Sequence, residues 1–150
     1  MPVKPVAAPS LPKPKFFYSP CVQAGPFLQV SGMVALDPAT QALSGNGPGE
    51  QTARILENLR VAMPEWGVTR ADLMIARIFT TAMDRFAEIN AAWEAFFAGG
   101  ETPPARTSVG VAALPLGALV EIEFCFYREA SSAPVWWCTA VRNHAASSRT

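Results

Sequence analysis

The sequence predicts an α+β fold in which two helices cover one face of a mixed β-sheet. Apolar residues recur with a helical period in two segments, and the segments around them are rich in β-branched and aromatic residues, as strands are. The order along the chain is strand, helix, strand, helix, strand, strand, which places both helices on one side of a sheet. The chain offers no third helix for the other face, so we expect copies of the chain to associate and cover it.

The first half of the folded region is expected to hold one strand and one helix, with one further strand ahead of them. "FLQVSGMVAL" at 27–36 has the composition of a strand and is stopped by the turn-like "DPAT" and a glycine-rich loop. "EQTARILENLRVAM" at 50–63 places its apolar residues on one helical face and its charged residues largely opposite. Pro64 should end or kink this helix because it lacks a backbone N–H.

The second half is expected to hold the other helix and three strands. "LMIARIFTTAM" at 73–83 is the first of these strands. Asp84 suits the N-cap of a helix that the Gly99–Gly100 pair stops. Two strands follow at 106–113 and 118–127, and the turn-like "LPLG" joins them.

The two ends of the chain differ in composition from the domain expected at 16–129. Residues 1–15 contain five prolines and few large apolar side chains, so we expect a flexible, proline-rich arm. Residues 130–150 form a tail that is rich in Ser and Ala but contains the apolar "VWWCTAV". This segment is too short to span a membrane, and an edge strand, an interface patch or a poorly ordered end would each fit it.

Composition and charge exclude several classes of protein. The 150 residues are enough for one domain, and Lys plus Arg equals Asp plus Glu at 12 each. A zero net charge gives no reason to expect nucleic acid or an anionic membrane as a partner. The three cysteines are far apart and the only histidine is His144, which argues against a metal site and against a disulfide framework. Because we find neither a secretory signal nor a run of about 20 apolar residues, we expect a cytoplasmic protein.

Ionisable residues stand at both ends of an apolar run at 103–123, "PPARTSVGVAALPLGALVEIE". Arg106 opens the run, and Glu121 and Glu123 close it. Charged side chains are rare in such runs unless they are paired or bind something. Arg106 could compensate one of the carboxylates from a neighbouring strand, or it could bind an anionic ligand. Glu121 and Glu123 are two residues apart, so on a strand both point to the same face.

The same run resembles the C-terminal signature of the RidA/YjgF family of small trimeric proteins, the reactive-intermediate deaminases. That signature is Pro-Ala-Arg, a short strand, Leu-Pro, and a strand that alternates hydrophobic residues with Glu. "VSG" at 30–32, "LDPAT", "QT...LENL" and "FAEIN...AFF" match the family in the same order, so the resemblance covers roughly residues 18–127. It implies a chorismate-mutase-like trimer with ligand clefts between subunits. It also implies an activity that many members have, the hydrolysis of enamines and imines, such as 2-aminoacrylate, to 2-keto acids and ammonia.

The resemblance also implies roles for individual residues. Arg106 matches the arginine that grips the substrate carboxylate, and Glu121 matches the carboxylate that helps to place water. Ser31 and Asn90 match polar residues near the cleft, although each could instead satisfy a buried backbone group. A guanidinium can hold a carboxylate through two parallel hydrogen bonds, which a lysine cannot copy. Because an imine is already reactive, we expect no metal and no cofactor.

Two positions depart from the family's common pattern. Cys21 stands where "GPYSQA" has a tyrosine that lies in the pocket, and Ser108 replaces the cysteine of Pro-Ala-Arg-Ser-Cys. If these residues face the cleft they bind substrate, and the smaller Cys21 leaves room for a bulkier substrate than 2-aminoacrylate. The alternative is that Cys21 belongs to the core. A nucleophilic Cys21 is disfavoured because the chain has no histidine outside its tail to act as a base.

The leading prediction is therefore a hydrolytic deaminase that acts on small carboxylate-bearing enamines or imines. The alternative is a non-catalytic trimer that binds a small acid and contacts a partner. A ribonuclease, an activity attributed to some relatives, is disfavoured by the zero net charge, the single histidine and the lack of a basic and aromatic patch.

Overall fold

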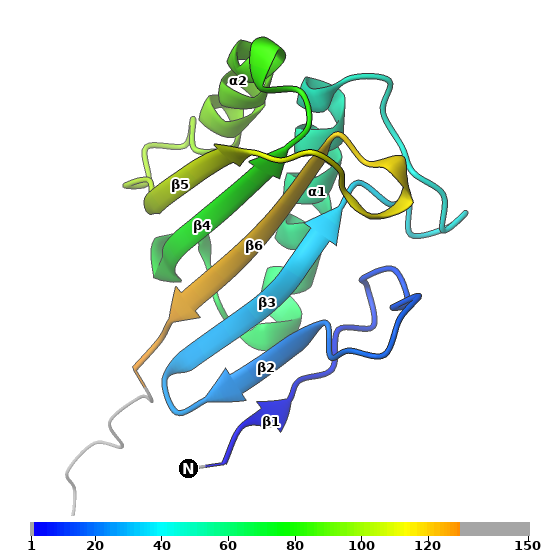
Figure 1. The fold of residues 1–150 in the computed structure, drawn as a ribbon. Coiled ribbons are helices and arrows are strands. Elements are labelled where there is room, and N and C mark those ends of the chain that lie inside the picture. The colour runs from blue at the N-terminus through cyan, green and yellow to red at the C-terminus, as the bar shows by residue number, and fades with distance from the viewer. Residues whose placement is uncertain (1, 130–150) are drawn as a thin grey trace, which may run out of the picture.

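A six-stranded sheet with two helices on one of its faces forms the structure, a computed structural model that describes residues 2–129 (Figure 1). The strand order is β1-β2-β3-β6-β4-β5; β4 and β5 are parallel, and all other neighbours are antiparallel. The predicted α+β class and the mixed sheet are confirmed. The segment "VWWCTAV" lies outside the described residues. The elements are β1 (Lys4–Pro5), β2 (Cys21–Ala24), β3 (Phe27–Val34), α1 (Pro48–Ala62), β4 (Leu73–Thr80), α2 (Phe86–Phe96), β5 (Ala105–Gly110) and β6 (Val120–Tyr127).

The core lies between the sheet and the two helices. Side chains alternate between the two faces of a strand, and on β6 the helix-facing Ile122 and Phe124 are fully buried. Ile55 of α1 belongs to the same apolar cluster. Burying side chains of this size stabilises the fold by about 1.5–3 kcal/mol each. Because every second residue of β6 serves the core, Glu121 and Glu123 are left on the opposite face.

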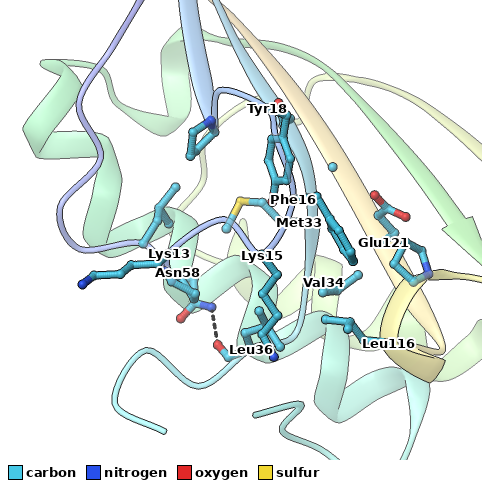
Figure 2. A pocket seen from close by; sticks show the side chains of 16 residues that line it. Lys13, Lys15, Phe16, Tyr18, Met33, Val34, Leu36, Asn58, Leu116 and Glu121 are labelled. Atoms are coloured by element: carbon cyan, nitrogen blue, oxygen red, sulfur yellow. Dashed lines mark hydrogen bonds between the residues drawn. The ribbon is translucent and has the colours of Figure 1, made fainter. Parts of the chain in front are cut away.

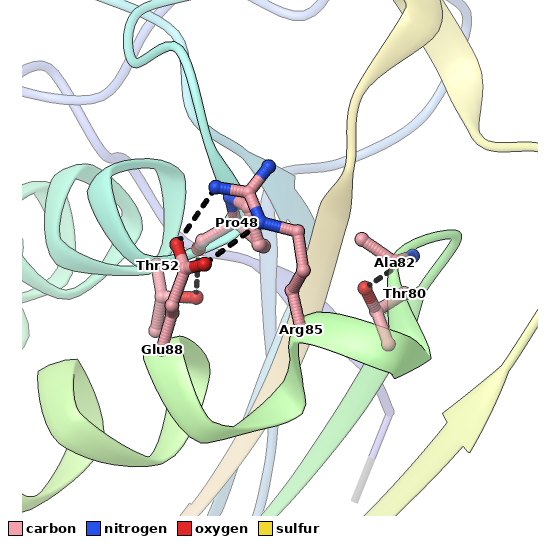
Figure 3. Close-up of polar contacts among 6 residues, drawn as sticks. All are labelled: Pro48, Thr52, Thr80, Ala82, Arg85 and Glu88. Atoms are coloured by element: carbon pink, nitrogen blue, oxygen red, sulfur yellow. Dashed lines mark hydrogen bonds and ion pairs between the residues drawn. The ribbon is translucent and has the colours of Figure 1, made fainter.

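The start of α2 differs from the prediction. Asp84 lies in a 3-10 turn, and no side chain caps the first turn of α2. The turn is held from the end of β4 instead, where Thr80 Oγ1 accepts a hydrogen bond from the backbone N–H of Ala82 at 3.0 Å. Beside it, Arg85 and Glu88 form a two-pronged ion pair with N–O distances of 2.7 and 2.9 Å (Figure 3). The residue that stabilises this turn therefore precedes it on the strand, and the sequence alone did not single it out.

The front of the chain packs against the domain. The predicted additional strand is β2, and Lys4–Pro5 adds a short edge strand to it. Trp66 Nε1 donates a hydrogen bond to the carbonyl of Ala7 at 3.0 Å, and Leu11 is buried. The prolines predicted a flexible arm at 1–15, but proline also favours an extended backbone and is tolerated at a sheet edge. In the structure the arm accordingly lies along the edge of the sheet.

Cys21 lies in the core of the structure rather than in a pocket. Its side chain is 0% exposed and belongs to the main apolar cluster, opposite Val30 on the neighbouring strand. Burial raises the pKa of the Cys21 thiol to about 12, so the thiol stays protonated at neutral pH. The structure therefore fits the prediction that Cys21 is a buried core residue. It does not fit a Cys21 that contacts the substrate or acts as a nucleophile.

We expect Cys21→Tyr to destabilise the protein. A ring at this position overfills the core and costs about 1–3 kcal/mol of folding free energy. The measurement is the melting temperature of Cys21→Tyr beside that of Cys21→Ala, because alanine shortens the same side chain without overfilling its site. A Cys21→Tyr protein that melts at the parent temperature would mean that the side chain faces open space.

Candidate functional site

Arg106 projects from the edge strand β5 toward one stripe of α2. Phe86, Asn90 and Trp93 recur at helical spacing and so share that stripe. Asn90 Oδ1 accepts a hydrogen bond from Arg106 Nη2 at 2.8 Å. The guanidinium carbon lies 5.5 Å from the Phe86 ring centroid and 5.3 Å from the Trp93 centroid. These contacts orient an exposed guanidinium, whose other N–H groups can bind a carboxylate.

Arg106 does not compensate the carboxylates of β6 within one copy of the chain. β4 lies between β5 and β6, so Arg106 and Glu121 are not on neighbouring strands. Glu123 pairs with Arg77 of β4 instead, with 2.7 Å between Nη1 and Oε1. Pairing of Arg106 with these two carboxylates within one copy of the chain is therefore excluded.

Ser108 lies two residues beyond Arg106, on the same face of β5. Its Oγ is buried and has no hydrogen-bond partner within residues 2–129. Leaving a buried hydroxyl unpaired costs about 1–3 kcal/mol, so such groups in native proteins call for an explanation. The structure therefore places Ser108 beside Arg106 but gives its hydroxyl no surface that a ligand could contact.

Glu121 forms a second cluster, on the face of the sheet that the helices leave open. It stands on β6 between Val34 of β3 and Phe79 of β4. Burial, and after it the charge of Glu123, raises the pKa of the Glu121 carboxyl. No group within residues 2–129 donates a hydrogen bond to this carboxyl to offset its burial. A raised pKa makes this carboxyl a stronger base than a solvent-exposed glutamate, which suits it to accept a proton and return it.

Gly32 makes room for the Glu121 carboxylate. A β-bulge between Val30 and Met33 brings Gly32 against β6. A Cβ at this position would overlap Glu121 Oε1 and would lie 2.9 Å from Cδ. Any residue other than glycine would therefore displace the carboxylate, so Gly32 belongs to the site.

A pocket of about 130 Å³ opens beside Glu121 (Figure 2). Ser31 and Tyr18 line it, and Ser31 Oγ donates a hydrogen bond to the carbonyl of Ser19 at 2.7 Å. That bond ties the segment before β2 to β3. Burial, and after it the charge of Glu121, raises the pKa of Tyr18. Tyr18 was not predicted from the sequence; its only signal was the aromatic run "FFY" just ahead of a position where the family commonly has tyrosine.

One copy of the chain does not bring the two predicted catalytic residues together. Arg106, Asn90 and Ser108 lie at the edge of the sheet on its helix side. Glu121 and Ser31 lie around the pocket on the open side. The described residues therefore hold two separate half-sites, one around the exposed guanidinium of Arg106 and one around the half-buried carboxyl of Glu121.

Neither a metal centre nor a membrane span is found within residues 2–129. No group of three or more His, Cys, Asp or Glu side chains in this part of the chain could hold a metal ion. No helix there is both long enough and apolar enough to cross a bilayer.

Comparison with known proteins identifies relatives over most of the chain. Residues 9–128 match the model of the family described as Endoribonuclease L-PSP. A RutC family protein of Aquifex aeolicus is 36% identical over 118 residues, which cover 79% of this chain and 94% of that protein. The crystal structure of the YjgF gene product from E. coli has a TM-score of 0.78 at 29% identity and covers 84% of this chain and 99% of its own. E. coli TdcF with bound serine also has a TM-score of 0.78, at 28% identity and the same coverage of 84% and 99%.

We expect Glu121→Gln to stabilise the protein at neutral pH. Burial raises the pKa of Glu121 in the folded state above its value in the unfolded chain, so the folded state holds the proton more tightly. Stability therefore falls as pH rises through the unfolded pKa and levels off above the folded pKa. Glutamine cannot ionise, so Glu121→Gln should melt above the parent at about pH 7.5 and close to the parent at about pH 4.

The control for this measurement is Glu94→Gln, which removes an exposed carboxylate from α2. Its melting temperature should differ little from the parent's at either pH. If Glu121→Gln melts below the parent at neutral pH, the carboxylate is stabilised by a contact and the account of its burial is incorrect.

Proposed function

The chain belongs to the family described as Endoribonuclease L-PSP, which includes the RutC and RidA/YjgF proteins, and on this premise we propose that it is a hydrolytic deaminase of carboxylate-bearing enamines and imines. The observation that supports this most is the Glu121 carboxyl, whose pKa is raised and which faces a pocket. Arg106 adds an oriented guanidinium with donors free for a ligand. A substrate with one carboxylate and one polarised C=N bond would use both side chains. Arg106 would bind the carboxylate and orient the substrate, and Glu121 would transfer protons at the C=N bond.

The two half-sites meet if the chain forms a homotrimer with its clefts between subunits, the arrangement that the resemblance implies. Apolar side chains remain exposed on the open side of the sheet, among them Val109 and Tyr127, and a second copy would cover them. The edge strand β5 of one subunit then brings Arg106 to the pocket beside Glu121 of the next. On this proposal the active site is complete only in the assembled protein.

In the proposed reaction, Arg106 binds the substrate carboxylate and holds the imine carbon beside Glu121. An enamine first takes up a proton on carbon and loses one from nitrogen, and so becomes the imine. Glu121 then positions a water molecule and removes a proton from it as the oxygen adds to the imine carbon. That proton passes to the nitrogen and gives a carbinolamine. Its hydroxyl then loses a proton while the nitrogen gains one, the C–N bond breaks, and a 2-keto acid and ammonia leave.

A second candidate function is the binding of a small acid without catalysis. TdcF with bound serine supports it, because serine carries a carboxylate and is not an imine. RNA cleavage, which the family's description suggests, finds no support in a chain with 12 basic residues, 12 acidic residues and one histidine.

We expect Arg106→Ala to lower kcat/KM for 2-aminoacrylate by roughly 30- to 900-fold. Losing a charge-assisted, two-pronged contact costs about 2–4 kcal/mol, which corresponds to that loss of rate. Arg106→Lys should recover little activity because an ammonium cannot make the same planar contact. The assay generates the imine with a second enzyme and follows its loss with and without this protein.

The matched control is Arg60→Ala, which removes an exposed arginine that pairs with Glu57 on the outer side of α1. It should keep parent activity. The small-acid binder would be favoured by two results together. The parent would bind a 2-keto acid without accelerating the hydrolysis of any imine, and Arg106→Ala would no longer bind that keto acid. An Arg106→Ala protein that fails to fold would show that the arginine is structural.

A further inference from the structure

We propose that the pocket beside Glu121 selects imino acids whose side chain is apolar and larger than methyl, and that Leu116 and Phe16 set this preference. This inference rests on the proposed function and names the substrate class of the same site. It is carried by the walls of the pocket, by the backbone of Leu116 and by the exposure of both residues.

The walls of the pocket away from Glu121 are mostly apolar. Its volume of about 130 Å³ is close to that of an engineered cavity of about 150 Å³ that binds benzene. An isobutyl or phenyl group therefore fits, whereas a methyl group would leave most of the space unfilled. Lys13 and Lys15 also line the pocket, and the aliphatic part of a lysine can add to such a wall while its charge stays in water. The apolar lining residues other than proline are Leu11, Phe16, Met33, Val34, Leu36 and Leu116.

Leu116 is held in a backbone conformation that branched residues seldom adopt. Its φ is 61° and its ψ is 16°, in the left-handed region that favours glycine. Its side chain is 44% exposed, so burial in the core does not explain the strain. Glycine would fit this backbone better, as it does at Gly117, where φ is 71°. A leucine kept at such a position indicates a use for its side chain, and the pocket wall is what that side chain forms.

Phe16 supplies the facing part of the wall. In Figure 2, Phe16, Val34 and Leu116 lie in succession beside Glu121. The ring of Phe16 is 63% exposed within one copy of the chain, so packing in the core does not account for its apolar surface. Its segment is anchored on both sides, by the burial of Leu11 and by the hydrogen bond from Ser31 to the carbonyl of Ser19. An apolar side chain of the substrate would lie between these two residues while its C=N carbon lies at the carboxyl.

The test compares imino acids that an amino-acid oxidase generates from alanine, leucine and phenylalanine. We expect kcat/KM for the leucine-derived imine to exceed that for the alanine-derived imine by at least about tenfold, because each added methylene in an apolar pocket contributes to discrimination. Leu116→Ala and Phe16→Ala should each move this ratio toward one. Leu116→Gly should do the same and should melt no lower than the parent, since glycine suits the backbone.

The matched control is Val61→Ala on α1, because Val61 is 45% exposed and does not line the pocket. Its leucine-to-alanine ratio should equal the parent's. A parent ratio near one, or a ratio that Leu116→Ala and Phe16→Ala both leave unchanged, would overturn the inference while leaving the deaminase proposal intact.

Calorimetric titration with 2-keto acids separates this inference from the proposed function. If no imine is hydrolysed, but 4-methyl-2-oxopentanoate binds at least about tenfold more tightly than pyruvate and Leu116→Ala removes the difference, the pocket preference stands and the deaminase proposal fails. Equal binding of the two keto acids by the parent would overturn the preference.

Discussion

The site depends on one close approach, that of Gly32 on β3 to the carboxylate of Glu121 on β6. Adjacent strands lie about 4.8 Å apart, so side chains on the same face of two neighbouring strands normally pack against each other and leave no room between a side chain and the next backbone. A missing Cβ at Gly32 lets the carboxylate settle against the backbone and become half-buried. That burial is the main cause of its raised pKa, and on the proposed function the raised pKa equips it for proton transfer. A carboxylate placed in this way destabilises the fold, and the fully buried Ile122 and Phe124 on the same strand offset that cost.

The order of the strands imposes the second constraint. Because β4 separates β5 from β6 and the two side chains lie on opposite faces of the sheet, Arg106 does not meet Glu121 within the same copy. Each half-site is nevertheless well formed, since α2 orients the guanidinium and the bulge in β3 seats the carboxylate. On the proposed function, these features of one chain are those of a site shared between subunits, and the exposed apolar side chains of the sheet would be the surface for that association.

Much of this arrangement could be predicted from the sequence, because it rests on local periodicity. The helix predicted at 50–63 is α1 in the structure. Arg106 and Glu121 could be identified as candidate site residues because they are charged residues at the ends of an apolar run. Features that depend on contacts distant in the sequence could not be predicted. Cys21 aligned with a pocket tyrosine but faces the core, because the pairing of β2 with β3 sets its direction. Tyr18 lines the pocket because of the course of the loop before β2, and hydrophobic periodicity does not predict the course of a loop.

Complementation between two inactive variants tests the shared site most directly. Arg106→Ala and Glu121→Gln are unfolded, mixed in equal amounts and refolded, and mixed trimers are verified by mass spectrometry. If each site takes Arg106 from one subunit and Glu121 from the next, random association restores roughly a quarter of the sites, and about a quarter of the parent activity returns. If both residues serve a site within one subunit, no mixed trimer contains an intact site. Activity that stays at the level of the single variants, with mixed trimers present, would contradict the account.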